Sequence, residues 1–368
     1  SYDYAKEERS RRQMLTNNIV ATYSKRIAEH DFKVMAGSNI EESKYHQIWA
    51  QRKGLLSGEK PELNLATGDP TVGSEHTSWA VAGFFGRINY AFKDRYLVEL
   101  NGRYDGSSRF PKGDRFAFFP SVSVGYRISE ENFMKPLNPI LSSLKLRGSY
   151  GSIGNQDVGL NRFISTLSGQ TDSWVINGVK QTSVSTPTVV SRTLTWETVK
   201  TIDFGVDARF LEDRLGLTFD WYRRTTSDIL TRANTPLTLG ADSPYENMGE
   251  LETPGWELAV DYRHDFKNGL SITVGAQVSD YKTKVKKWTN NTLMPEYGTN
   301  GNGWFTDTKY YKEGMVLGDI WGLQVDRLLQ ASDFDTNGNL LSHIPDQTSV
   351  FPTGDIFAPG DVLYRDPV

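Results

Sequence analysis

The residues of this chain best suited to hold a metal ion form one short run, Asp333-Phe334-Asp335-Thr336-Asn337-Gly338. Alternate oxygen ligands followed by a glycine are typical of the first half of an EF-hand calcium loop. The twelfth position of such a loop supplies a bidentate glutamate, whereas this chain has Ile344 there. An Asx-rich turn without an ion is therefore the favoured interpretation, and calcium at Asp333, Asp335 and Asn337 is the alternative.

The residues that enzymes use for catalysis show no catalytic spacing. No HExxH, GxSxG, phosphate-binding loop or dinucleotide-binding glycine pattern is present, and the chain contains no cysteine. We therefore expect neither an enzyme nor a bound cofactor. The histidines stand apart from one another as His30, His46, His76, His264 and His343.

Aromatic residues in long polar segments are the candidates for binding a sugar, because the apolar faces of pyranose rings match aromatic planes. Aromatic residues also pack beneath long loops, so the sequence leaves both interpretations open. These candidates are Trp174, Trp288, Trp304, Tyr310 and Tyr311.

The run RYDGSSRF supplies a charged candidate group, consisting of Arg103, Asp105 and Arg109. These side chains could bind a substrate or a partner, although a structural charge network is the favoured interpretation. Over the whole chain 41 basic residues face 45 acidic residues, for a net charge of -4. This balance argues against nucleic acid as a partner.

The elements that position these residues are predicted by alternation of apolar and polar side chains. In the stretch YLVELNGRYDGSSRF, apolar or small residues from Tyr96 to Tyr104 alternate with Glu99, Asn101 and other mostly polar residues. The run 84–92 alternates in the same way. A short turn at 93–95 joins the two runs and predicts a β-hairpin.

The same alternation recurs along the chain and predicts roughly ten strands with no competing amphipathic helix. Beyond the first hairpin the predicted strands lie at 116–128, 144–150, 202–210, 215–221, 256–262 and 270–278, with weaker ones at 15–25 and 32–42. Short connections are expected near 27–31, 93–95, 211–214 and 264–269, and long ones at 43–77, 153–195, 226–250 and after 284.

The two faces of these strands favour lipid on one side and water on the other. No apolar run is long enough for a membrane helix, but a barrel strand exposes only every second residue to lipid. The apolar bands at 84–92, 96–104 and 202–210 rise roughly 25 Å at the usual strand tilt, and aromatic residues mark their ends. We predict an all-β antiparallel transmembrane barrel, with a soluble β-rich carbohydrate-binding or structural protein as the alternative.

Several long motifs occur in order along most of residues 78–330, and together they resemble the SusC/RagA family of TonB-dependent outer-membrane transporters. The motifs are KDRYLVELNGRYDGSSRF, FFPSVSVGYRISEENF, LKLRGSYGSIGNQDVG, WETVKTIDFGVDARFLEDRLGLTFDWY, ENMGELETPGWEL and EGMVLGDIWGL.

This resemblance implies a barrel of about 22 strands that holds a plug. It also implies energy coupling through the TonB complex, a SusD-like surface lipoprotein as a lid, and import of oligosaccharides or, in some members, peptides. We expect an internal portion of the barrel, because the sequence contains no plug, TonB box, signal sequence or closing strands. Residues 1–284 are expected to form the strands with their short periplasmic turns and long extracellular loops. Residues 285–368 are expected to form an extracellular loop region.

Outer-membrane lipid and lipopolysaccharide are the expected partners of the outward face. Lys282, Lys284 and Lys286 continue that face past Val278 and could meet lipopolysaccharide phosphates, with a solvated strand extension as the alternative. A passive porin is a further reading, but it would need a complete unplugged barrel.

Val98→Arg tests the predicted lipid-facing side. It should lower the free energy of unfolding by about 2 to 4 kcal/mol, because it places a charge in the hydrocarbon layer. Glu99→Gln lies on the opposite side and should have a mild effect. The measurement is equilibrium unfolding in lipid vesicles, and normal folding of Val98→Arg in outer membranes would overturn the lipid-facing assignment.

Overall fold

The computed structural model describes residues 3–233, 235–236, 238, 243–288, 313–317, 324–345 and 357–365. The described residues divide between two compact units. The first contains those up to 288 together with 313–317, and the second contains 324–345 and 357–365. Among the described residues, no helix has the length and apolar character needed to cross a membrane.

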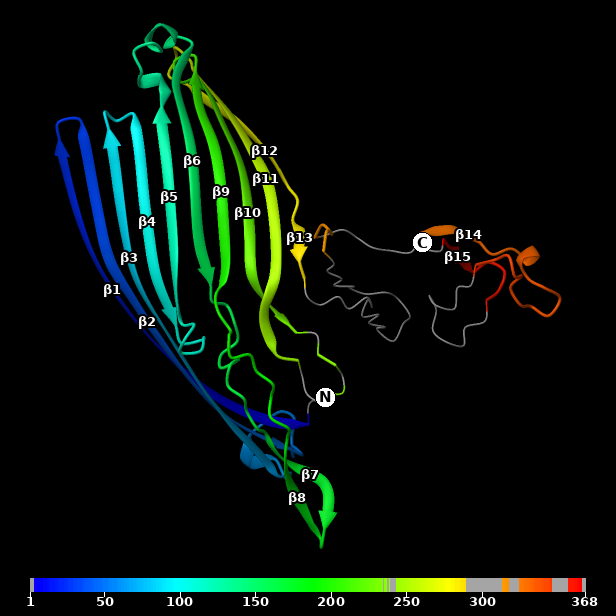
Figure 1. Ribbon diagram of the computed structural model, residues 1–368. Helices are drawn as coiled ribbons and strands as arrows, with labels where there is room; N and C mark the ends of the chain where they lie inside the picture. The colour runs from blue at the N-terminus through cyan, green and yellow to red at the C-terminus, as the bar shows by residue number, and fades with distance from the viewer. Residues whose placement is uncertain are drawn as a thin grey trace. The chain divides into compact units, whose positions relative to one another are not determined.

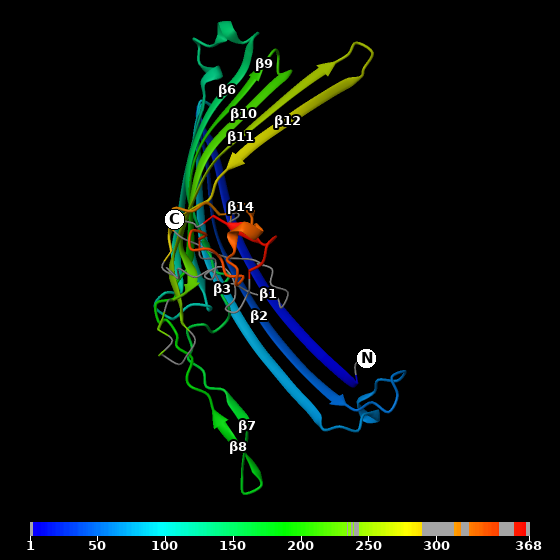
Figure 2. The same ribbon diagram turned by 90° about the vertical axis from the view of Figure 1, so that its right-hand side faces the viewer.

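The first unit is built on one curved antiparallel sheet (Figures 1 and 2), so the all-β prediction is confirmed. Neighbouring strands follow one another in the chain, except that β6 pairs with β9 and β13 pairs with β11. The strands are β1 (Tyr4–Ile27), β2 (His30–Lys53), β3 (Pro70–Phe92), β4 (Tyr96–Ser107), β5 (Phe116–Arg127), β6 (Leu141–Asn155), β9 (Glu197–Phe210), β10 (Leu215–Arg232), β11 (Tyr245–Asp265), β12 (Ser271–Tyr281) and β13 (Lys284–Lys287).

The connections differ in length at the two ends of the sheet, as predicted. In Figure 1 the short turns lie at the upper end of the strands, together with the longer connection at 128–140, and the other long connections lie at the lower end. One long connection carries a separate hairpin of β7 (Gly169–Ile176) and β8 (Val179–Val184). Three 3-10 helices lie in other connections: η1 (Leu63–Leu65), η2 (Ile128–Glu130) and η3 (Lys135–Leu137).

The predicted hairpin of β3 and β4 is confirmed in its register. Phe92 pairs with Tyr96 next to the turn, and Phe84 pairs with Tyr104 farther along the ladder. Side chains of paired residues lie on the same face of a sheet. The apolar runs of the two strands therefore lie side by side on one face.

The first strands are longer than predicted. β1 and β2 contain 24 residues each, so only residues 54–69 separate β2 from β3. The prediction of a loop at 43–77 was wrong for most of its length, and part of the predicted loop at 226–250 is likewise strand. In segment 43–77 the hydrophobic alternation ends, because Lys44, His46 and His76 stand where apolar side chains would continue it. The backbones of β2 and β3 nevertheless continue to pair there.

The two faces of the sheet differ in chemistry. One face, called the apolar face below, carries cross-strand rows such as Ile88–Leu100–Val122. It is not covered by the described part of the chain, since Phe118 and Phe204 are 62% and 58% exposed. The opposite face, called the polar face, carries most of the charged residues. An uncovered apolar face is what a lipid-contacting sheet requires.

Aromatic side chains lie at both ends of the apolar face. Near the short turns the Tyr96 and Tyr126 rings stack 5.1 Å apart, and both hydroxyls donate to the Glu131 carboxylate at 2.7 and 3.3 Å. Near the long connections Tyr104 stacks on Phe116, also at 5.1 Å. Aromatic rings with a polar tip favour the membrane–water boundary, so these positions agree with the two predicted girdles.

An apolar cluster anchors long connections on the polar face. Phe110, Phe119, Val158 and Trp196 are buried together. The Trp196 Nε1 group donates a hydrogen bond to the Arg115 carbonyl oxygen at 2.9 Å. The cluster therefore fastens the connections that follow β4 and β6 to strand β5.

The second unit is a small element with its own core. Strand β14 (Val325–Leu328) pairs antiparallel with β15 (Val362–Tyr364), and the 3-10 helix η5 (Ala331–Asp333) follows β14. Leu329, Ile344 and Leu363 are buried against one another.

Trp196→Ala should lower the free energy of unfolding of the first unit by about 3 to 5 kcal/mol, because it leaves a cavity in the buried cluster. Trp174→Ala is the matched control, since Trp174 on β7 is 74% exposed. Urea unfolding of the two variants in lipid vesicles gives the comparison. Equal losses for both variants would contradict an anchoring role for the cluster.

Candidate functional site

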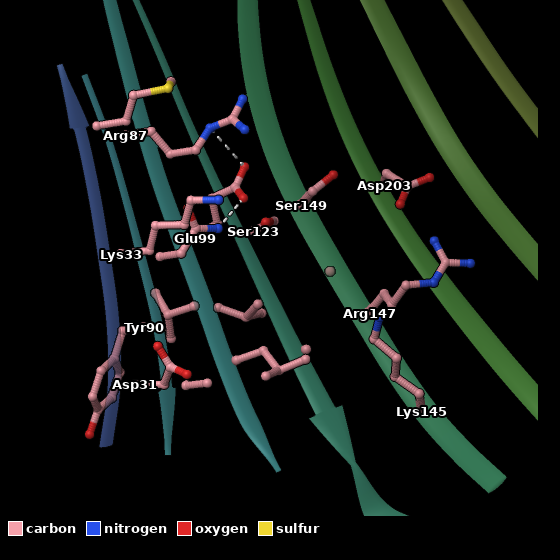
Figure 3. A pocket seen from close by; sticks show the side chains of 18 of the residues that line it. Asp31, Lys33, Arg87, Tyr90, Glu99, Ser123, Lys145, Arg147, Ser149 and Asp203 are labelled. Carbon is pink, nitrogen blue, oxygen red and sulfur yellow. Dashed lines mark hydrogen bonds and ion pairs between the residues drawn. The ribbon is translucent and has the colours of Figure 1, made fainter. Parts of the chain in front are cut away.

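The polar face holds two groups of side chains that a solute could contact. The first, the mid-sheet hollow, has a volume of about 650 Å³ and is drawn in Figure 3. The second, the loop-end hollow, has a volume of about 330 Å³. It is lined by Arg12, Tyr45, Trp79 and Arg109, among others.

Polar side chains of β3 and β4 form a hydrogen-bonded group in the mid-sheet hollow. The Arg87 Nε donates to the Asn101 Oδ1 at 2.6 Å, and the Asn101 Nδ2 donates to the Glu99 Oε1 at 2.8 Å. Asn89 donates to the other oxygen of Glu99. The single acidic group of this cluster is therefore held by two amide donors, and the Arg87 Nε lies 3.7 Å from its Oε1.

Arg147 reaches across a whole strand on the same face. Its guanidinium donates to both Asp207 oxygens at 2.8 and 3.0 Å, and to the Asp220 Oδ2 at 3.1 Å. Arg147, Gly205 and Asp220 pair across β6, β9 and β10 in one row. A side chain at Gly205 would block this bridge, because its Cβ would lie 2.6 Å from the Arg147 Cζ.

A second bridge uses the same arrangement. Arg209 of β9, Gly216 of β10 and Asp261 of β11 form one cross-strand row. The Arg209 Nη1 reaches the Asp261 Oδ2 at 2.7 Å across the glycine. The two bridges, called the Arg–Gly–Asp bridges below, pair the arginines of this part of the polar face with Asp207, Asp220 and Asp261.

Some charges of the mid-sheet hollow stay available to a solute. Lys33 and Lys145 line it and make no ion pair within the described part of the chain. Figure 3 shows them on β2 and β6 respectively, on either side of the Glu99 cluster. Solvated cations of this kind can bind an anionic group of a passing solute.

The loop-end hollow combines aromatic planes with guanidinium groups. The Arg12 Cζ lies 5.3 Å from the centre of the Tyr45 ring, and the Arg109 Cζ lies 5.5 Å from the centre of a Trp79 ring. These distances are those of cation–π contacts. Tyr45 lies on β2, in the segment 43–77 for which the sequence predicted a loop, and Trp79 lies on β3, between that segment and the predicted strand at 84–92. The spacing of Tyr45, Gln47 and Trp49 on one side of β2 is the signal that could have revealed Tyr45.

The predicted charged group is only partly brought together. Arg103 donates to both oxygens of Asp105 at 2.9 and 2.8 Å, which makes an ion pair within one strand. Arg109 instead donates to the Val158 carbonyl oxygen at 2.7 Å and lines the loop-end hollow. The three residues therefore do not form one binding group.

The two predicted aromatic residues within the described part of the chain lie on different elements. Trp174 projects from the β7–β8 hairpin. Trp288 follows β13 and is half-buried, because its ring packs against Gly249. The backbone N–H of Trp288 donates to the Glu313 carboxylate at 3.2 Å. Trp304, Tyr310 and Tyr311 lie outside the described residues.

The carboxylates of the predicted calcium loop have partners within the chain. Asp333 accepts from the Arg327 guanidinium at 3.0 Å and from the Gln330 backbone N–H at 2.7 Å, and these bonds hold the pKa of Asp333 below its ordinary value. Asp335 accepts from the backbone N–H groups of Asn337 and Asn339, both at 2.8 Å. Calcium at this loop stays a prediction, and the ion would compete with these donors. Among the described residues, no three His, Asp or Glu side chains gather to hold a metal.

Comparison with known proteins identifies a family over nearly the whole chain. The family model described as TonB dependent receptor-like, beta-barrel matches residues 3–355. The chain is 30% identical to the TonB-dependent receptor SusC of Bacteroides thetaiotaomicron over 332 residues, which is 81% of this chain and 32% of that protein. It is 29% identical to the TonB-dependent receptor P3 of Formosa agariphila over 358 residues, or 96% of this chain and 34% of that protein. The chain thus spans about a third of the length of these relatives.

The fold is similar to that of a solved transporter. The structure of the RagAB peptide transporter matches with a TM-score of 0.69 at 25% sequence identity. The match covers 80% of this chain and 32% of that chain. The curved sheet therefore corresponds to part of a larger barrel.

Gly205→Val tests the first Arg–Gly–Asp bridge. The added methyl groups displace the Arg147 guanidinium, so the free energy of unfolding should fall by roughly 1 to 3 kcal/mol. Gly86→Val is the matched control, since a Cβ at Gly86 on the apolar face meets only the Met35 carbonyl oxygen, at 3.6 Å. Thermal unfolding in lipid vesicles measures both. An unchanged transition for Gly205→Val would refute the requirement for glycine.

Proposed function

Because this chain belongs to the SusC/RagA type of the TonB-dependent receptor-like β-barrel family, we propose that it forms part of an importer of oligosaccharides across the bacterial outer membrane. Members of this family are outer-membrane β-barrels, which places the apolar face against lipid and the polar face in the lumen. The proposed import uses a SusD-like surface lipoprotein as a lid and energy from the TonB complex.

The loop-end hollow is the observation that carries the proposal of a sugar ligand. It presents the rings of Tyr45 and Trp79 on the lumen side, at the end where the long connections lie. An aromatic plane binds the apolar face of a pyranose, and the guanidinium groups of Arg12 and Arg109 can donate hydrogen bonds to ring hydroxyls. Trp174 on the β7–β8 hairpin is a further proposed contact for the sugar, before it enters the barrel.

The polar face of β9 to β11 also supports passage of a polar solute. The Arg–Gly–Asp bridges pair Arg147 and Arg209 with acids of β9 to β11, while Asp203 and Glu257 on the same face make no ion pair within the described part of the chain, so an uncharged oligosaccharide meets a hydrated, mildly acidic wall. In this proposal the ligand is captured between the long loops and the lid. Displacement of the plug through TonB then opens the route.

Import of peptides is the second candidate. It is favoured by the similarity to the RagAB peptide transporter and by the two guanidinium groups of the loop-end hollow, which suit carboxylates. A peptide ligand would bind chiefly through Arg12 and Arg109, whereas a sugar would bind chiefly through the aromatic rings.

Trp79→Ala in the full-length transporter with its lid protein should weaken oligosaccharide binding by roughly tenfold to a hundredfold, the loss expected when a buried aromatic contact is removed. Isothermal titration with a panel of oligosaccharides and of peptides measures the effect. Phe133→Ala is the control, because Phe133 is an exposed aromatic residue in the connection between β5 and β6.

The outcome separates the two candidates. Weaker binding of oligosaccharides for Trp79→Ala, with no effect of Phe133→Ala, supports the sugar importer. Binding of peptides alone, with a loss in Arg12→Gln, supports the peptide importer instead. Unchanged binding of both ligand classes in all variants would mean that the loop-end hollow is not the ligand site.

A further inference from the structure

Six polar side chains form two cross-strand rows on the outward side of β1, β2 and β3. They lie an even number of residues from Phe84 along continuous ladders, so they point to the same side as the apolar face. All six are exposed. This group, called the outer grid, consists of the row Arg11–His46–His76 and the row Gln13–Lys44–Ser78.

The outer grid surrounds a hollow of about 380 Å³. The His46 and His76 rings stack with their centres 4.0 Å apart, which leaves their nitrogen atoms at the rim of the stack. Each imidazole and the Ser78 hydroxyl can donate a hydrogen bond. The hollow is thus lined by donors from three neighbouring strands.

The charge of the outer grid is positive. Arg11 makes no ion pair with any described residue, whereas Lys44 contacts Glu42 at 2.8 Å. A divalent cation would be repelled by Arg11 and Lys44. An anion with several acceptor oxygens matches both the charge and the donors.

The position of the outer grid relative to lipid identifies the source of that anion. The apolar face continues toward the grid through Leu15 and Ile40, which are 68% and 48% exposed. Leu15 and Gln13 are neighbours on this side of β1, so the grid begins about 7 Å beyond Leu15, at 3.3 to 3.4 Å per residue. Ile48 and Val72 lie on the same side beyond the grid. It lies at the end of the long connections, on the side where lipid headgroups meet the barrel.

We propose that the outer grid binds a phosphate group of the glycolipid of the outer leaflet. Arg11 opposes the charge of the phosphate, Lys44 adds a donor that it shares with Glu42, and His46, His76 and Ser78 donate to its oxygens. The lysines that the sequence placed on the outward face near β13 form a weaker candidate. Lys286 is paired with Glu252 at 3.4 Å, as Lys44 is with Glu42, so the outer grid is favoured by its unpaired Arg11 and its stacked imidazoles and not by Lys44.

The test uses the full-length transporter in nanodiscs and three probes: diphosphorylated lipid A, the same lipid after enzymatic removal of its phosphates, and inorganic phosphate. The wild type should bind the phosphorylated lipid more tightly than the dephosphorylated one. Arg11→Gln/Lys44→Gln should weaken that binding roughly thirtyfold, the contribution expected of two cations near an anionic lipid surface. Native mass spectrometry counts the bound lipid.

Lys25→Gln/Lys286→Gln is the matched control. Lys25 lies on the outward side of β1 near its short turn, and the double variant removes the same number of positive charges. It should bind the phosphorylated lipid as the wild type does. His46→Phe/His76→Phe provides a second test that keeps two stacked rings without their nitrogen atoms, and loss of two donors should weaken binding roughly tenfold.

Three results would overturn the proposal. The first is equal affinity of the Arg11/Lys44 and Lys25/Lys286 double variants for the phosphorylated lipid. The second is equal affinity of the wild type for the phosphorylated and the dephosphorylated lipid. The third is displacement of the lipid by an equal concentration of inorganic phosphate. The last result would indicate a site for free anions. Sugar binding at the loop-end hollow is on the opposite side of the sheet and is measured separately.

Discussion

Register in the antiparallel ladder is the constraint on which the whole structure depends. Side chains alternate between lipid and water, so a slip of one residue would exchange the two faces along a whole strand. Such a slip in β4 would move Leu100 into the lumen and Glu99 into lipid. The short turns at one end of the sheet fix the pairing of the strands that they join, and so they hold this register.

The same geometry organises the charges of the lumen. Because strands lie about 4.8 Å apart, an arginine can reach an acid two strands away only if the strand between them presents no side chain. Gly205 and Gly216 meet this condition. The side chains of the resulting ion pairs are partly exposed to solvent. The two arginines thus stay on the polar face with acidic partners on neighbouring strands. In the proposed function, ligand contacts then fall to the aromatic rings and to the few cations without an ion pair among the described residues.

Much of the fold could be predicted from the sequence, because hydrophobic alternation with a period of two residues is a direct record of one-sided burial. The hairpin around residues 93–95 and the strands from β4 to β12 follow this pattern. The outer parts of β1, β2 and β3 lack it, since both of their sides carry polar groups, and Tyr45 was consequently assigned to a loop.

The candidate site was less predictable than the fold for a related reason. Arg147 meets Asp207 and Asp220, which are 60 and 73 residues away in the chain, so no local pattern reports the contact. Arg109 was identified from its sequence motif, but its partner Val158 belongs to a distant connection. Calcium ligands at Asp333 and Asp335 were suggested by spacing alone, which does not reveal the competing donor Arg327.

The Arg–Gly–Asp bridges also have a mechanical consequence. Each one ties strands that are not hydrogen-bonded to each other, and it runs around the circumference of the barrel instead of along its axis. Widening the sheet here would have to lengthen the ion pairs from β6 to β10 and from β9 to β11, as well as the backbone hydrogen bonds between these strands. This part of the sheet therefore resists widening around the circumference of the barrel.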